Sequence, residues 1–181
     1  MTVQIALLRA INVGGNRMVS MADLRALLTG LGFQDVRSLL QSGNLVFRSK
    51  SKTGASLEHF LEAELAKKTG LQTDFLVRST EEWKTVITRN PFPDEARRDP
   101  AHLLVVLLKR EPTGQGVEDL RAAIVGPETI QADGRQLYAV YPAGVGESKL
   151  TNKLIEKKLG SPGTGRNWNT VLKLAALAEE L

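Results

Sequence analysis

The sequence predicts an α+β protein made of two ferredoxin-like subdomains, the second lacking its last strand and followed by a C-terminal helix. Two observations lead to this prediction. Over the first 78 residues, apolar runs and helical periodicities follow the order β-α-β-β-α-β. After a charged, proline-bounded stretch at residues 94–100, most of that order repeats. We therefore expect a first subdomain at 1–78, a connecting helix and loop at 79–100, and a second subdomain at 101–181.

The elements of the first half are marked by apolar spacing and by boundary signals. Ser20 and Asp23 have the spacing of a capping box, and leucines at i, i+3, i+4 and i+7 follow it, which is typical of an amphipathic helix. The segment Gln-Ser-Gly-Asn between two short apolar runs indicates a hairpin. We expect strands at residues 3–8, 36–40, 45–47 and 73–77, and helices around residues 24–31 and 57–65.

The connecting segment begins with a further capping box, Ser79 and Glu82, and a short helix that Asn-Pro-Phe-Pro ends. The dipeptide Asp133-Gly134 is a preferred two-residue hairpin turn. No apolar run after Gly160 predicts a fourth strand, and the last helix is expected to begin near Asn167. We expect strands at 102–108, 129–132 and 136–141, and helices around 117–124, 150–155 and 167–181.

Composition narrows the possible functions. The 181-residue chain has 42% apolar residues and no cysteine, which excludes disulfides, thiolate metal sites and a cysteine nucleophile. No apolar run is long enough to span a membrane, and the N-terminus does not read as a secretory signal, so we expect a cytoplasmic protein. The two histidines lack metal-site spacing, and we predict neither a metal nor a cofactor. No catalytic motif stands out, and whether the protein is an enzyme stays open.

Polar residues gather where the first strand is expected to end. The segment Leu-Arg-Ala-Ile-Asn-Val-Gly-Gly at 8–15 follows the strand, and in a ferredoxin-like unit the turn between strands 2 and 3 lies at the same sheet edge. Arginine suits carboxylate or phosphate, and glycines let backbone N–H groups approach a ligand. A simpler interpretation stays open, in which the glycines form turns and the arginine pairs with a carboxylate. The candidate residues are Arg9, Asn12, Gly14, Gly15, Ser42, Gly43 and Asn44.

Three blocks of sequence resemble a known family. They are ALLRAINVGGNRMVSMADLRALLTGLGF, LLQSGNLVF and GRNWNTVLKL, and together they cover essentially the whole chain in order. They are similar to the bacterial domain-of-unknown-function 1697 family. The resemblance implies two ferredoxin-like subdomains, and it implies no activity and no catalytic residue.

The third block adds a second group of candidate residues. Asn167 can cap the last helix, and its neighbours could complete an anion pocket if that helix folds back over the first site. The alternative is a cap and a tryptophan anchor. A glycine-containing stretch at 143–154 also precedes a helix, but Glu147 follows Gly146 where a Walker loop requires lysine. There we favour capping by Ser148. The residues added to the candidate site are Arg166, Asn167 and Asn169.

Charge and aromatic content indicate whether the protein could bind nucleic acid. The chain carries a net charge of +4, and residues 147–173 alone hold an equal excess of basic residues. RNA-binding domains of this topology stack bases on aromatic residues of strands 1 and 3, where this chain has only Phe47. Binding through the nucleic-acid backbone stays open, and it would use Lys149, Lys153, Lys157 and Lys158.

The sequence therefore supports three functional hypotheses. The first is a pocket for a small anionic, phosphate-bearing ligand at the edge of the first sheet. The second is a nucleic-acid-binding module that uses the basic C-terminal region. The third is a scaffold without a ligand. No oligomeric state is predicted.

Overall fold

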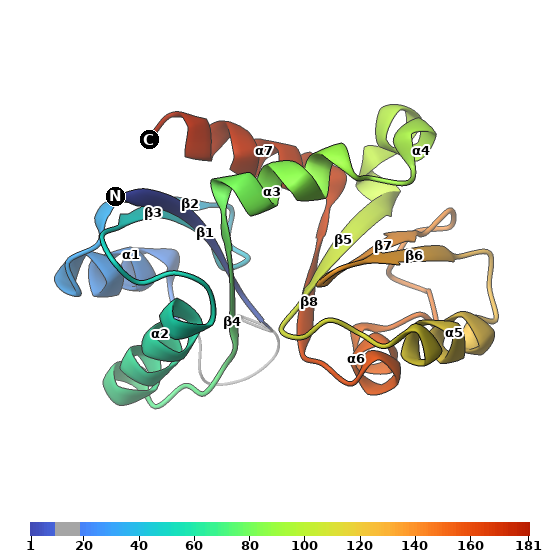
Figure 1. Cartoon of the computed structure of the whole chain (residues 1–181), viewed down its shortest axis with the longest axis horizontal. Helices are drawn as coiled ribbons and strands as arrows, with labels where there is room; N and C mark the ends of the chain where they lie inside the picture. The colour runs from blue at the N-terminus through green and yellow to red at the C-terminus, as the bar shows by residue number, and fades with distance from the viewer. Residues whose placement is uncertain (10–18) are drawn as a thin grey trace. The chain divides into compact units, whose positions relative to one another are not determined.

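The computed structural model describes residues 1–9 and 19–181. It confirms the α+β class: helices and two four-stranded antiparallel sheets make up the described chain (Figure 1). The first half contains β1 (Thr2–Leu8), α1 (Met21–Gly30), β2 (Gln34–Leu39), β3 (Asn44–Ser49), α2 (Gly54–Thr69), β4 (Phe75–Ser79) and α3 (Thr80–Thr88). The rest contains α4 (Pro93–Arg98), a 3-10 turn (Pro100–His102), β5 (Leu103–Leu108), α5 (Gly114–Ala123), β6 (Thr129–Asp133), β7 (Gln136–Val140), α6 (Asn152–Leu159), β8 (Gly163–Asn167) and α7 (Trp168–Glu179).

The two sheets have the same strand order. The first is β2-β3-β1-β4 and the second is β6-β7-β5-β8, and every neighbouring pair is antiparallel. In the first sheet Ile5 of β1 pairs with Val46 on one side and with Arg78 on the other. This order, with a helix after the first strand and another after the third, is the ferredoxin-like arrangement. The prediction of two ferredoxin-like subdomains is confirmed.

Each sheet is covered on one face by its own pair of helices. In the first, alternate residues of β1 such as Ala6 and Leu8 join Leu24 of α1 and Leu61 of α2 in a buried core. In the second, α5 and α6 pack in the same way, and Leu120 and Ile155 meet β5 and β7 (Figure 1). Because side chains alternate along a strand, Val3 and Ile5 lie on the other face of β1. That face carries a pocket described below.

The chain divides into two compact units, Met1–Thr85 with Lys173–Leu181, and Val86–Leu172. Both boundaries fall inside helices, α3 and α7. The last residues of the chain therefore belong to the first unit, where Glu180 forms an ion pair with Arg37 of β2 at 2.7 Å. In the second unit, the hydroxyl of Tyr138 donates to the carbonyl of Val86 at 2.6 Å.

The expectation that the second half lacks its last strand is wrong. Residues 163–167 form β8, which pairs with β5 through Leu107 opposite Thr164 and Val105 opposite Arg166. The sequence of β8 does not predict a strand, because it has two glycines, which are depleted in strands, and no alternation of apolar residues. A Cβ on Gly163 would lie 2.9 Å from the carbonyl oxygen of Leu107, so this position has room only for glycine.

The charged segment between the halves contains a helix that the sequence did not indicate. Pro93 begins α4 there, and a 3-10 turn follows from Pro100. Proline is well suited to the first turn of a helix because its missing N–H has no helical partner there. The charged residues of this segment form exposed i, i+3 ion pairs, such as Arg98 with Glu95.

The close approach at Gly163 leads to a test of β8. We expect Gly163→Ala to lower the free energy of unfolding by about 1–3 kcal/mol, because the new methyl group overpacks the contact with β5. At Gly165 the nearest atom to an added Cβ is 3.4 Å away, so the control Gly165→Ala is expected to change stability by less than about 1 kcal/mol. Urea denaturation of both variants measures the difference. Equal effects would contradict this account of β8.

Candidate functional site

The end of β1 lies beside the turn that joins β2 and β3. The N–H of Leu8 donates to the carbonyl of Gly43 at 2.9 Å, and Leu7 pairs with Asn44. On the other side, the N–H of Arg9 donates to the carbonyl of Asp74 at 3.0 Å, just before β4. Arg9 and residues 42–44 therefore occupy one rim of the first sheet. We call Arg9, residues 40–43 and Asp74 the sheet rim.

The side chain of Arg9 is paired with a carboxylate. Its Nη1 lies 3.5 Å from Oδ2 of Asp74, and the two side chains are 33% and 31% exposed. This is the ion pair that the simpler interpretation of Arg9 requires. A partly exposed pair contributes at most about 1 kcal/mol, so Asp74 orients the guanidinium without binding it tightly.

The turn at residues 40–43 is shaped by backbone conformation and by Asn44. Leu40 and Gly43 both have positive φ angles, 59° and 74°. The side chain of Asn44 is fully buried and donates to the carbonyl of Leu39 and to Oγ of Ser42, both at 2.9 Å. Asn44 therefore holds the turn from inside, whereas Ser42 is exposed on its outer surface and Gly43 is buried. Three further candidates, Asn12, Gly14 and Gly15, lie outside the described residues.

The C-terminal candidates belong to the second compact unit. Arg166 is in β8, and its Nη1 donates to Oγ1 of Thr164 at 2.7 Å and to the carbonyl of Gly165 at 2.9 Å. Burial lowers the pKa of Arg166 to about 10, which leaves the guanidinium protonated at neutral pH. Asn167 accepts a hydrogen bond from the N–H of Thr170 at 3.0 Å, as a helix cap does. Asn169 is exposed in the first turn of α7.

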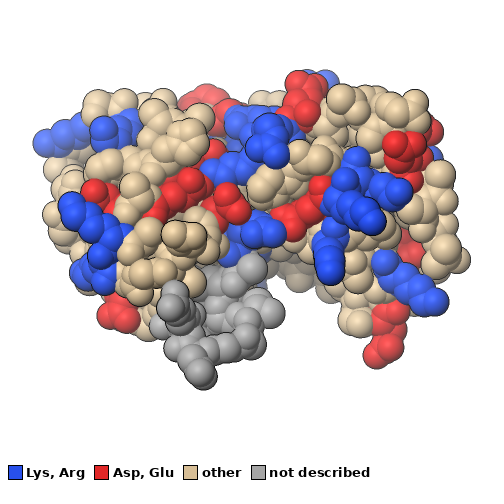
Figure 2. Space-filling model, turned by 90° about the horizontal axis from the view of Figure 1, so that it is seen from below, with Lys and Arg blue, Asp and Glu red and all other residues tan. Residues whose placement is uncertain are grey.

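The four candidate lysines lie on or just before α6. Lys149, Lys153 and Lys157 are exposed and Lys158 is half-buried. Among the described residues, no ion pair forms at any of these lysines. Figure 2 shows basic side chains interrupted by acidic ones rather than an unbroken basic surface. Acidic side chains among basic ones weaken the attraction of a surface for nucleic acid.

The loop before α6 differs from its prediction. Thr151, not Ser148, caps the helix, since Oγ1 of Thr151 accepts from the N–H of Leu154 at 3.2 Å. The hydroxyl of Ser148 instead donates to the carboxylate of Glu128 and accepts from the N–H of Leu150. Burial, together with the negative charge of Glu128, raises the pKa of Tyr141 to about 12.

A hollow that no sequence pattern indicated lies on the face of β1 that α1 and α2 do not cover. Its lining comes from β1, from the start of α3 and from the end of α7. These segments are far apart in the sequence, and helical periodicity does not show that Trp83 and Ala178 line the same hollow. Lys84 and Glu179 gave no signal, because single charges on a helix are usually solvated.

The described residues contain neither a cluster of metal ligands nor a membrane-spanning helix. Within these ranges, no three His, Cys, Asp or Glu side chains are grouped so that they could hold a metal ion. Likewise, no helix in the described part of the chain is long and apolar enough to cross a membrane.

Fold and rim together define a duplicated ferredoxin-like α+β protein with a polar sheet edge. The chain belongs to the family described as "Protein of unknown function (DUF1697)", which matches residues 1–138, as the sequence blocks predicted. A conserved bacterial protein from Streptococcus pneumoniae has a similar structure, with a TM-score of 0.69, 25% sequence identity and 98% of each chain covered. No curated protein matches this chain. The structural likeness extends beyond the family match, through α6, β8 and α7.

Proposed function

We propose that the protein binds a small anionic ligand, such as a phosphorylated metabolite, at the sheet rim. The observation that carries the proposal is the hydrogen bond from Leu8 to Gly43, which brings a half-exposed arginine next to a turn with positive φ angles. A guanidinium offers several N–H donors in a fork that matches phosphate oxygens. Ser42 adds a hydroxyl group on the same turn.

Asp74 determines how such a ligand would bind. Its carboxylate holds the guanidinium at 3.5 Å before a ligand arrives, which reduces the side-chain entropy lost on binding. It also repels an incoming anion, so the affinity is expected to be modest and to fall with added salt. Among the described residues of the rim, Arg9 and Ser42 offer hydrogen-bond donors to an anion, and the proposal is limited to binding.

Arg9→Ala tests this proposal. We expect the full-length protein to bind pyrophosphate or a sugar phosphate in isothermal titration calorimetry, and Arg9→Ala to weaken binding at least about tenfold, because a hydrogen bond to a charged group contributes about 1.5–3 kcal/mol. Arg97→Ala is the matched control, since Arg97 forms an exposed ion pair with Asp94 on α4. Equal affinity of Arg9→Ala and the unmodified protein would overturn the proposal.

The same titration separates the proposal from the nucleic-acid alternative. The feature that favours this alternative is the set of α6 lysines without ion pairs in the described chain. A labelled single-stranded oligonucleotide would then bind with a steep salt dependence, and Lys157→Glu would weaken it while Arg9→Ala would not. Under the rim proposal, the phosphorylated small molecule responds to Arg9→Ala and not to Lys157→Glu.

A further inference from the structure

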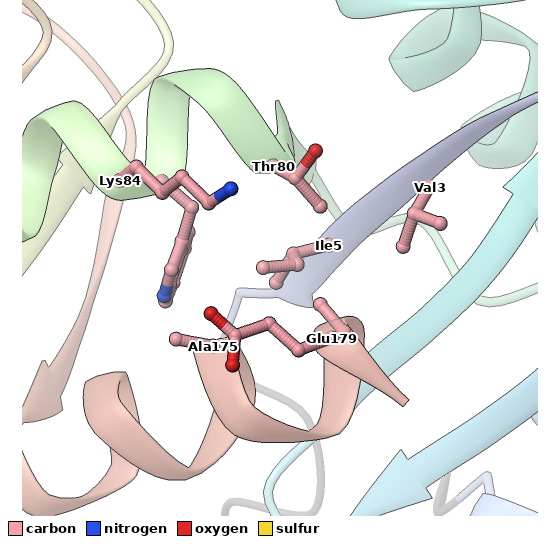
Figure 3. Close-up of a pocket in the computed structure, with 8 residues that line it drawn as sticks. Val3, Ile5, Thr80, Lys84, Ala175 and Glu179 are labelled. Atoms are coloured by element: carbon pink, nitrogen blue, oxygen red, sulfur yellow. The ribbon is translucent and has the colours of Figure 1, made fainter. Parts of the chain in front are cut away.

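The first compact unit contains a pocket of about 300 Å³ on the face of β1 opposite α1 and α2 (Figure 3). Val3 and Ile5 of β1 form its floor. The start of α3 lines one side and the last turns of α7 line the other. The complete lining is Val3, Ile5, Thr80, Trp83, Lys84, Ala175, Ala178 and Glu179.

Two alanines keep the pocket open. Ala175 and Ala178 are three residues apart on α7 and therefore point to the same side, toward β1. Their methyl groups fill little space, whereas the neighbouring Leu174 of α7 places a full leucine side chain in the core. The indole of Trp83 is almost fully buried, with 1% exposed, and adds an apolar wall. The interior of the pocket is therefore suited to a hydrocarbon group.

Opposite charges stand on the two sides of this apolar interior. In Figure 3 the amino group of Lys84 extends from α3 and the carboxylate of Glu179 extends from α7, with Ile5 between them. Both side chains belong to exposed residues, and neither forms an ion pair or a hydrogen bond with a described residue. Thr80 contributes its methyl group, because its hydroxyl donates to Glu81 at 3.1 Å and points away from Ile5 in Figure 3.

We propose that this pocket binds a small zwitterion with an apolar side chain, of the chemical class of the α-amino acids. Lys84 receives the carboxylate, Glu179 receives the ammonium group, and the side chain lies on Val3, Ile5 and Trp83. A simple anion would meet the repulsion of Glu179, and a simple cation would meet that of Lys84. A volume of about 300 Å³ is at the lower end for ligand pockets, which favours one amino acid over a nucleotide cofactor.

This pocket is separate from the sheet rim. Arg9 directly follows β1 and lies four residues after Ile5, which is about 13 Å along an extended chain. The inference therefore does not depend on the proposed function, and each can fail alone.

The test uses the full-length protein with L-leucine and L-phenylalanine, followed by NMR chemical shifts of the Trp83 indole N–H and by calorimetry. We expect saturable binding of at least one of them. L-Leucinamide lacks the carboxylate and N-acetyl-L-leucine lacks the ammonium group, so each should bind at least about tenfold more weakly than L-leucine. Lys84→Ala should abolish the preference for L-leucine over L-leucinamide.

A pair of neighbouring alanines provides the control. Ala175→Leu fills the pocket and should abolish binding, whereas Ala176→Leu places the same side chain on the exposed side of α7 and should leave binding unchanged. Thermal unfolding of both variants establishes that they are folded. The inference is overturned if neither amino acid binds up to about 10 mM, or if Ala175→Leu binds as well as Ala176→Leu. If the unmodified protein binds neither amino acid and Lys84→Ala lowers its stability, Lys84 and Glu179 attract each other and do not bind a ligand. That result also overturns the inference.

Discussion

Glu58→Ala is expected to lower the free energy of unfolding by about 3–5 kcal/mol, the usual cost of removing one partner from a buried ion pair. Glu58 is 2% exposed on α2, and its Oε1 accepts a hydrogen bond from the N–H of Val77 at 2.8 Å. Nη1 of Arg78, also 2% exposed, lies 3.9 Å from the same oxygen. Glu58→Ala removes the carboxylate that faces both the N–H of Val77 and the guanidinium of Arg78. Urea denaturation with a two-state fit measures the loss.

Glu62 provides the matched control, one turn further along α2. Its Oε1 accepts from the N–H of Phe75 at 2.9 Å, but the side chain is only half-buried. Glu62→Ala is therefore expected to cost about 1 kcal/mol, the net value of an ordinary hydrogen bond. Glu58→Gln keeps an acceptor for the N–H of Val77 and removes the charge. We expect its loss of unfolding free energy to lie between those of Glu58→Ala and Glu62→Ala. If Glu58→Ala is no more harmful than Glu62→Ala, burial of the pair does not stabilise this edge.

These carboxylates protect an exposed edge of the sheet. β4 is the last strand of its sheet, so the N–H groups of Phe75 and Val77 have no strand partner, and Glu62 and Glu58 accept their hydrogen bonds. The second sheet repeats the arrangement, with Glu156 of α6 accepting from the N–H of Gly163 in β8 at 2.7 Å. Unpaired edges invite pairing with other chains, and covering them with side chains prevents it.

Phe47→Ala is expected to cost about 3–5 kcal/mol, as large-to-small changes of buried aromatic residues do. Phe47 is fully buried in the core between the first sheet and its helices. Its ring meets that of Phe33 edge-on, with centroids 4.9 Å apart. The variant loses this aromatic contact and leaves a cavity. Chemical denaturation followed by circular dichroism gives the change in stability.

Phe60 and a conservative variant provide the comparison for Phe47. Phe60 is half-buried and 6.3 Å from Phe33, so Phe60→Ala is expected to destabilise clearly less. Phe47→Leu keeps most of the volume and should cost less than Phe47→Ala. The opposite ranking would mean that the Phe47 ring contributes little to this core. Since the ring is buried, Phe47, the one aromatic residue of strands 1 and 3, is not available to stack on an RNA base.

Much of the element order could be predicted because its signals are local. Ser20 caps α1 as expected, with the N–H of Asp23 donating to Oγ of Ser20 at 3.0 Å. The box at α3 is reciprocal: Ser79 donates its N–H to Glu82 at 2.8 Å, and Glu82 donates its own to Oγ of Ser79 at 3.2 Å. Both partners of such a hydrogen bond lie within one turn of the same helix, so the local sequence is enough to predict it.

The missed elements depend on distant neighbours. β8 has a sequence poor in strand formers, and it exists because β5 offers an unpaired edge and Gly163 can approach it closely. Ser148 looked like a helix cap, but the carboxylate of Glu128, twenty residues away, receives its hydroxyl group. In both cases a tertiary partner outweighs the local preference.

The sequence by itself determined the α+β class, the order of most strands and helices, and the neighbourhood of Arg9 and the turn at Gly43, which follows from topology once the first four strands are recognised. The tertiary structure alone decided that Asp74 pairs with Arg9, that Asn44 is buried, and that Val3, Lys84 and Glu179 line one pocket. Periodicity shows which face of an element is apolar, but it carries no information about which distant face will meet it. That choice depends on how side chains from separate segments fill a shared volume.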